Sequence, residues 1–137
     1  MINKILLAVI IATIVSQGLK LLLFLITKKK LKLQDLIVTG SMPSSHTAIL
    51  AATTTSILFI QGLSPLAIFA IVVTLLISRD AFGVRRFAGE EGNMIKKLSK
   101  ANKIKLTPFH FTKGHTPLEV FVGLIIGIFC AVFVYLI

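Results

Sequence analysis

Long apolar stretches dominate the chain, and short polar segments separate them. The four stretches cover residues 5–26, 47–60, 63–77 and 117–137. A helix that crosses the hydrocarbon core of a membrane needs about 20 mostly apolar residues. The first and last stretches meet this length by themselves, whereas the second needs residues 44–46 and the third needs residues up to Phe82. The pattern therefore predicts four membrane helices.

The composition excludes a soluble domain and a disordered chain. Of the 137 residues, 55% are hydrophobic and 15% are charged, and the mean hydropathy is +0.95. Soluble domains are about 45–50% apolar and about 25% charged, and a chain this apolar cannot stay solvated without folding. We expect residues 1–137 to form a single membrane-embedded domain. The first stretch follows Lys4 as in a secretory signal, but it runs on to Ile26, so we expect a membrane helix there.

The last connection between apolar stretches, residues 85–114, is long for a compact bundle. Ile95, Leu98 and Ile104 stand among lysines in this segment, which indicates a short amphipathic helix at the membrane surface. The expected fold class is all-α: a polytopic membrane helix bundle with about four transmembrane helices and a short interfacial helix in the last long loop.

The charges are distributed unevenly across this bundle. Fifteen Lys and Arg against five Asp and Glu give a formal net charge of +10. Four spans place both chain ends on one face and the two longer connections, which carry nearly all the charge, on the other. By the positive-inside rule that face is cytoplasmic, so we expect a multi-pass protein of the cell membrane with its polar groups on the cytoplasmic side. The basic residues lie beside apolar helices without interleaved aromatic residues, which favours anionic lipid over nucleic acid as a partner.

The first segment that could carry chemistry is residues 40–46, which leads directly into an apolar stretch. Pro43 and the hydroxyl residues Ser44 and Ser45 are typical of a helix start with unpaired amide groups, and such a start binds phosphate. A plain helix cap beside an unrelated His46 is the alternative. Because Ser45 and His46 are adjacent, their side chains diverge around a helix, so a hydrolase-type Ser-His pair is not expected.

The second segment is residues 114–119, which opens the last apolar stretch. If the helix includes His115, then His115 and Glu119 share one face, and the carboxylate can hold one imidazole nitrogen while the other acts as a nucleophile or base. In the competing interpretation, Thr116 and Glu119 form a capping box around Pro117. The segment alone does not decide between the two.

An arginine cluster follows the third apolar stretch. Arg85 and Arg86 stand close to Arg79, and a guanidinium forks naturally onto phosphate oxygens. Asp80 is placed to orient one of them. The alternative is that these arginines only anchor the helix at the membrane edge, which suits Arg79 better than Arg85 and Arg86.

The first apolar stretch contains two polar residues on one helical face, Gln17 and Lys20. Lys20 precedes Lys28 by eight residues, which places it about 12 Å inside the membrane at 1.5 Å per residue. An ionisable group at that depth is a functional candidate, although a lysine can also snorkel to the surface.

These groups converge on one end of the predicted bundle and suit an oxyanion such as phosphate. We expect no metal and no other cofactor, because the sequence contains no compact His, Asp and Glu ligand set. Cys130 is the only cysteine, which excludes an intrachain disulfide and a thiolate metal cluster.

The chain resembles a known family. Residues 40–48, 80–90 and 114–123, with Gln17 and Lys20, resemble the divergent branch of the type 2 phosphatidic acid phosphatase superfamily, membrane proteins related to acid phosphatase and vanadium-dependent haloperoxidase. By that resemblance, His115 attacks phosphorus, Glu119 orients it, and His46 protonates the leaving alcohol.

The chain departs from the superfamily pattern at several positions. Ser45 replaces a glycine and Glu119 replaces an aspartate, and Phe109 stands where an arginine normally precedes the nucleophilic histidine by six residues. The resemblance then implies that other basic residues supply the missing charge, namely Lys20, Arg85 and Arg86, with Asp80 or Arg79 in support.

The sequence thus predicts an integral-membrane phosphatase that hydrolyses a lipid or isoprenoid phosphate monoester or pyrophosphate through a phosphohistidine, without a metal. The expected catalytic residues are His115, His46 and Glu119. The expected substrate-binding residues are Lys20, Ser44, Ser45, Arg85, Arg86, Asp80, Gln17 and Gly114. The alternative is a non-catalytic anionic-lipid-binding or membrane assembly subunit. A homo-oligomer is compatible with the sequence, and an anion transporter would require one.

Overall fold

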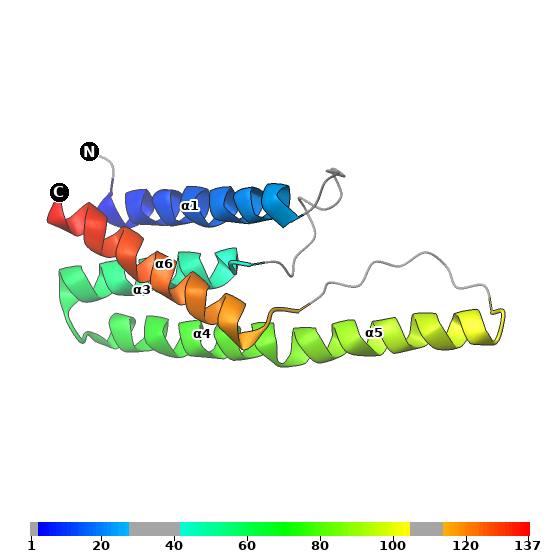
Figure 1. Ribbon diagram of the computed structural model, residues 1–137. Helices are drawn as coiled ribbons and strands as arrows, with labels where there is room; N and C mark the ends of the chain where they lie inside the picture. The colour runs from blue at the N-terminus through cyan, green and yellow to red at the C-terminus, as the bar shows by residue number, and fades with distance from the viewer. Residues whose placement is uncertain (1–2, 28–41, 105–113) are drawn as a thin grey trace.

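The computed structural model describes residues 3–27, 42–104 and 114–137, and it is all-α over these ranges, as expected (Figure 1). In the described part of the chain, four helices form a bundle, and a fifth projects beyond it. The helices are α1 (Lys4–Thr27), α3 (Ser45–Gln61), α4 (Pro65–Phe82), α5 (Val84–Ala101) and α6 (Pro117–Leu136).

The bundle has two distinct ends. Figure 1 shows both chain termini and the turn between α3 and α4 at one end, while α1 and α4 terminate at the other end. We call this second end the site end, because α3 and α6 begin there. The arrangement places residues 44–46 beside residues 114–117, as the alternation of four spans predicts.

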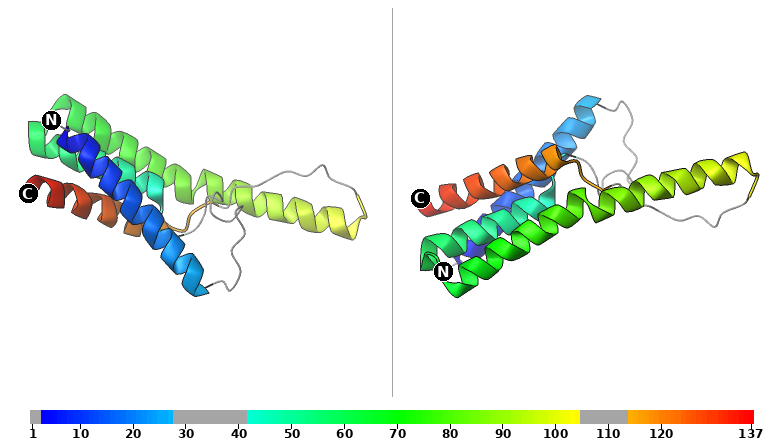
Figure 2. Two further views of the ribbon diagram at one scale, coloured as in Figure 1. Left: turned by 90° about the horizontal axis from the view of Figure 1, so that it is seen from above. Right: turned by 90° about the horizontal axis from the view of Figure 1, so that it is seen from below.

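Among the described residues, three segments are long and apolar enough to cross a membrane: Lys4–Thr27, Pro65–Ala101, which contains α4, and Pro117–Leu136. The remaining bundle helix, α3, has 17 residues, which corresponds to about 25 Å at 1.5 Å per residue. It packs against α1, α4 and α6 (Figure 2). Because α3 is enclosed by longer helices, much of its surface meets protein instead of lipid.

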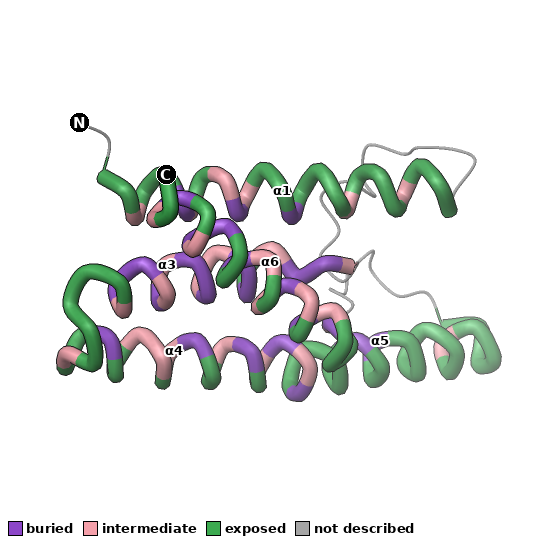
Figure 3. The backbone as a smooth tube through the Cα atoms, turned by 60° about the vertical axis from the view of Figure 1, so that its left-hand side comes forward, coloured by how far each residue is buried: buried purple, intermediate pink, exposed green. Residues whose placement is uncertain are grey.

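The last long connection contains a helix, as predicted, but this helix is longer and begins earlier than expected, and its place at the membrane surface stays a prediction. Helix α5 has 18 residues and starts at Val84, directly after Gly83. It continues roughly along the direction of α4 and extends beyond the site end (Figures 1 and 2). Ile95 and Leu98 belong to α5, whereas Ile104 lies after its last residue. The exposed residues, green in Figure 3, cover most of α5.

Helices α3 and α6 pack closely because small residues face each other. A Cβ atom added at Gly127 would collide with the carbonyl oxygen of Ala48 and would lie 2.7 Å from the Cβ of Ala51. A Cβ atom at Gly123 would collide with Thr47 Oγ1 and the carbonyl oxygen of Ser44. Two glycines four residues apart permit this approach of the two backbones. We call these residues the α3–α6 contact.

Further contacts hold the other helices to this pair. Ala8 of α1 packs in a buried cluster with Ala131 and Val134 of α6, and Thr54 of α3 hydrogen-bonds Thr74 of α4 at 2.9 Å. Within a bilayer, small residues and side-chain hydrogen bonds between helices supply much of the association, since lipid is as apolar as the side chains. The buried residues, purple in Figure 3, lie where the four bundle helices face one another.

The α3–α6 contact predicts opposite effects for two glycine-to-alanine substitutions. Gly127→Ala should lower the free energy of unfolding by about 1–3 kcal/mol, because the added methyl group overpacks the contact. Gly18→Ala should be neutral or stabilising by about 0.5–1 kcal/mol, because nothing lies within 4 Å of the added Cβ and alanine favours a helix. Thermal unfolding in detergent, followed by circular dichroism, measures both; equal shifts for the two variants would contradict the packing described.

Candidate functional site

His115 lies immediately before α6 and not inside it. Helix α6 begins at Pro117 with Thr116 as its N-cap. His115 and Glu119 therefore do not share a face of one helix, as they would if the helix included His115. The amide of His115 donates to the carbonyl oxygen of Ala81 at 2.9 Å, which ties the segment to the end of α4. The histidine is only 8% exposed.

Gly114 permits the close approach of this segment to α5. A Cβ atom at Gly114 would collide with the backbone amide nitrogen and Cα of Arg86 and would lie 2.6 Å from the carbonyl carbon of Arg85. The residue before the candidate nucleophile therefore rests directly on the first turn of α5. A side chain at position 114 would move His115 away from α4 or α5.

Glu119 forms the capping box and also contacts His115. Its Oε2 atom accepts a hydrogen bond from the Thr116 amide at 2.9 Å, and the Glu119 amide donates to Thr116 Oγ1 at 3.3 Å, which completes a capping box. The same Oε2 lies 3.1 Å from His115 Nδ1. An ionised carboxylate can only accept, so Nδ1 carries the proton of this bond. In the neutral imidazole, Nε2 then has a free lone pair.

The surroundings of His115 lower its pKa from the ordinary value of 6.5. Burial, which disfavours the charged imidazolium, is the largest cause, while the hydrogen bond and negative charge of Glu119 act in the opposite direction. The positive charges of Lys20 and His46 lower the pKa further. Together these effects favour the neutral imidazole. Lys20 and His46 also act electrostatically on the same histidine.

The start of α3 is joined to the start of α6 by backbone contacts. The Ser44 amide donates to the carbonyl oxygen of Glu119 at 3.1 Å, and Thr47 Oγ1 donates to the carbonyl oxygen of Ser44 at 3.0 Å. Ser44 is the N-cap of α3, but its side chain makes no capping bond. Its Oγ is buried and has no hydrogen-bond partner within the described ranges. Pro43 lies before the helix start that it helped to predict, because α3 begins at Ser45.

The remaining predicted binding residues lie at different depths. Lys20 is partly buried and continues the stripe at four-residue spacing formed by buried Ala8, Ala12 and Ser16. His46 is exposed and Ser45 is partly buried. Gln17 is exposed and makes no hydrogen bond among residues 3–27, 42–104 and 114–137, so the structure does not connect it to His115.

Two of the three arginines are already paired. Arg85 Nε lies 2.7 Å from Asp80 Oδ2, and Arg86 Nε lies 3.0 Å from Glu90 Oε1. Asp80 thus orients Arg85, as the sequence analysis expected. These pairs are about half exposed. Each engages the guanidinium through Nε, and the terminal nitrogens make no hydrogen bond among the described residues. The Gly114 contact places both arginine backbones beside the segment that holds His115.

Several features of the site could not be predicted, and some predictions fall on residues that are not described. The His115 amide donates to the Ala81 carbonyl, and the Ser44 amide donates to the Glu119 carbonyl. Both bonds join backbone atoms, which every residue type has, so the sequence carries no pattern that predicts them. Phe109 and His110 lie outside the described residues. In the part of the chain that the structure covers, no group of three His, Cys, Asp or Glu residues could hold a metal.

Long apolar helices around a polar end define the class of this protein as an integral-membrane helix bundle. Comparison of the sequence with protein-family models matches residues 1–130 to the divergent PAP2 family, where PAP2 denotes type 2 phosphatidic acid phosphatase. The chain belongs to this family. It is 34% identical over 140 residues to YuiD, described as an uncharacterized membrane protein of Bacillus subtilis (strain 168), covering 90% of this chain and 88% of the relative. No solved structure matches the chain significantly.

The balance of charges around His115 gives a prediction that needs no enzymatic assay. In histidine-labelled protein in detergent, NMR titration should place the pKa of His115 below 6.5. Glu119→Gln should lower that pKa further, since it removes the negative charge that stabilises the imidazolium. His46→Gln should raise the pKa of His115, since it removes an effect that lowers it. A His115 pKa at or above 6.5, or shifts of the same sign in both variants, would contradict the site geometry.

Proposed function

We propose that the protein is an integral-membrane phosphatase that hydrolyses a lipid or isoprenoid phosphate monoester or pyrophosphate through a phosphohistidine on His115, without a metal. The observation that carries this proposal is the pair formed by His115 Nδ1 and Glu119 Oε2 at 3.1 Å. This pair leaves Nε2 of a buried, neutral imidazole available beside Lys20 and His46. Membership of the divergent PAP2 family supports a phosphatase-related role.

In the first half of the reaction, the lone pair of His115 Nε2 attacks phosphorus, and the bond from phosphorus to the substrate's ester or bridging oxygen breaks. Protonated His46 gives its proton to that leaving oxygen. The imidazole ring gains positive charge in this step, and the Glu119 carboxylate stabilises it through the Nδ1 proton. Glu119 also holds the start of α6, so the ring and the helix share one anchor.

In the second half, water attacks phosphorus, the phosphorus–nitrogen bond breaks, and His46, now neutral, accepts a proton from the attacking water. Inorganic phosphate leaves, and both histidines return to their starting states. The two histidines therefore have different roles: His115 forms the covalent bond, and His46 moves the proton.

The negative charge of the phosphoryl oxygens would be met by fixed donors and cations, which is the term that usually dominates such catalysis. The first amides of α3 point out of the helix start, and they lack side-chain capping from Ser44. We assign Lys20, the Ser44 hydroxyl and Ser45 to the phosphate. A third source of charge is the terminal nitrogens of the paired arginines: Asp80 holds Arg85, and Gly114 lets Arg86 approach.

The predicted activity is the release of inorganic phosphate from lipid phosphates by the purified protein, inhibited by vanadate. His115→Ala should reduce turnover to the uncatalysed background, because no nucleophile remains. His46→Ala should reduce it by about 10²–10⁴-fold, the usual contribution of a general acid. The matched control is His110→Ala, which removes the third histidine and should leave turnover intact.

Folded wild-type protein without vanadate-sensitive turnover on any lipid phosphate would overturn this function. The second candidate is a non-catalytic anionic-lipid binder, and the observation in its favour is that Arg85 and Arg86 already hold carboxylates. In that case lipid phosphate binding, measured by calorimetry, would survive His115→Ala unchanged. Turnover abolished by His115→Ala separates the two.

We further propose that the site end faces the cytoplasm, because α1 ends there, α3 begins there, and the sequence that joins these two helices is rich in lysine. The test is Lys29→Cys in a Cys130→Ala background, labelled in intact cells with an impermeant maleimide. The introduced cysteine should resist the reagent until the membrane is permeabilised. Labelling in intact cells would place the site end on the outer face.

A further inference from the structure

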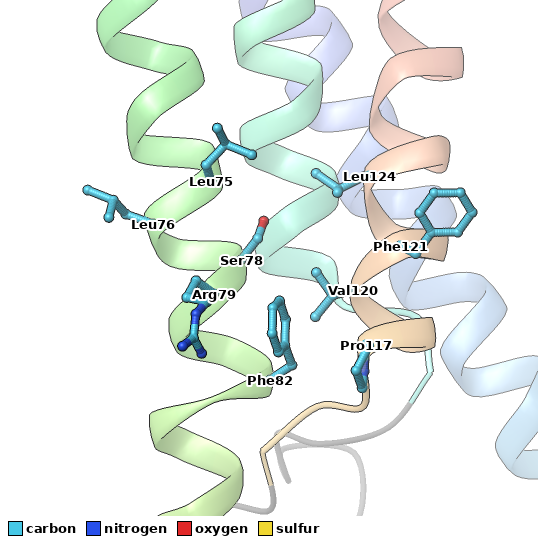
Figure 4. Close-up of a pocket in the computed structure, with 9 residues that line it drawn as sticks. All are labelled: Leu75, Leu76, Ser78, Arg79, Phe82, Pro117, Val120, Phe121 and Leu124. Atoms are coloured by element: carbon cyan, nitrogen blue, oxygen red, sulfur yellow. The ribbon is translucent and has the colours of Figure 1, made fainter.

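An apolar groove runs between α4 and α6, next to the segment that holds His115. It has a volume of about 510 Å³, which falls within the usual size range of small-molecule sites. Leu75 and Leu76 of α4 and Phe121 and Leu124 of α6 form its walls, and Arg79 lines it as well (Figure 4). His115, His46 and Lys20 do not line it.

Arg79 stands at the site end of the groove. Its guanidinium lies 5.8 Å from the ring centroid of Phe82. A Cβ atom at Gly83 would lie 2.9 Å from Arg79 Nη1 and 2.8 Å from the Arg79 carbonyl oxygen, so the glycine leaves room for this side chain beside the backbone. Within the described ranges, Arg79 has no carboxylate partner, in contrast to Arg85 and Arg86.

The chemistry of the groove matches one kind of occupant. Its apolar walls suit a hydrocarbon chain, and a guanidinium at the membrane edge suits a phosphate head group, to which it can donate two hydrogen bonds. Basic pockets between transmembrane helices are known to take phospholipid head groups. A second copy of this chain is a poor fit, because it carries the same net charge of +10.

We propose that the α4–α6 groove binds an anionic phospholipid, with one hydrocarbon chain between Leu76 and Leu124 and the phosphate on Arg79. The site is separate from His115, so it stands whether or not the protein hydrolyses phosphate. Its expected effect is to hold an anionic lipid beside α4 and α6, the two helices whose ends position His115.

The test uses the full chain in detergent, mixed with phosphatidylglycerol or phosphatidylcholine, and native mass spectrometry to count retained lipid. Arg79→Gln should weaken phosphatidylglycerol retention by about tenfold, as expected for loss of a charge-assisted hydrogen bond. Leu124→Trp, which fills the groove, should weaken retention of the same lipid, and Arg79→Lys should retain part of the binding. The matched controls are Lys97→Gln, which removes one exposed charge from α5, and Ile128→Trp, which adds the same bulk on α6 outside the groove.

Equal losses in Arg79→Gln and Lys97→Gln would show only general attraction to charge, and they would overturn the site. Retention unaffected by Leu124→Trp would mean that no chain enters the groove. Equal retention of phosphatidylcholine would exclude selection of anionic lipid, and a dimer that Leu124→Trp dissociates would assign the groove to a second copy. The thermal unfolding of each variant confirms that a loss of lipid does not follow from a loss of fold.

Discussion

The site depends on how closely α3 and α6 approach each other. Gly123 and Gly127 remove the side chains that would keep the backbones apart, and Thr47, Ala48 and Ala51 occupy the space. At the opposite end of the pair, Phe59 stacks on Tyr135 with 5.1 Å between ring centroids. In lipid, where apolar burial gives little drive for helices to associate, such fitting of small residues determines which helices pair. Because Gly123 lies near the site end, the same contact sets the separation between the starts of α3 and α6.

The second constraint is that one carboxylate serves both the fold and the histidine. Glu119 Oε2 accepts from the Thr116 amide and lies within hydrogen-bond distance of His115 Nδ1, while the Glu119 carbonyl accepts from the Ser44 amide. The orientation of the imidazole is therefore coupled to the capping of α6 and to the position of α3.

The sequence predicted the elements with strong apolar patterns and missed those set by local backbone contacts. Residues 5–26 and 117–137 lie almost entirely within α1 and α6, because a long apolar run has no other stable form in a membrane. Helix α5 was expected to be short because the prediction used only Ile95, Leu98 and Ile104. Val84 and Phe87 continue the same apolar spacing back to Gly83, which gives no sign of whether a helix ends or restarts there. In the site, the spacing within residues 115–119 offered two alternatives, a contact between His115 and Glu119 or a capping box, and it could not reveal that both form. The close packing of Gly114 on Arg86 joins residues far apart in the chain, and no pattern in one sequence encodes it.

The central claim is that the starts of α3 and α6 form one phosphate pocket with His115 as its nucleophile. The most direct measurement is a structure of the purified protein with bound vanadate, which imitates the phosphoryl group during transfer. The claim predicts vanadium bonded to His115 Nε2, with His46 and the first amides of α3 around its oxygens. Vanadate bound elsewhere, or imidazoles that point to separate cavities, would contradict it.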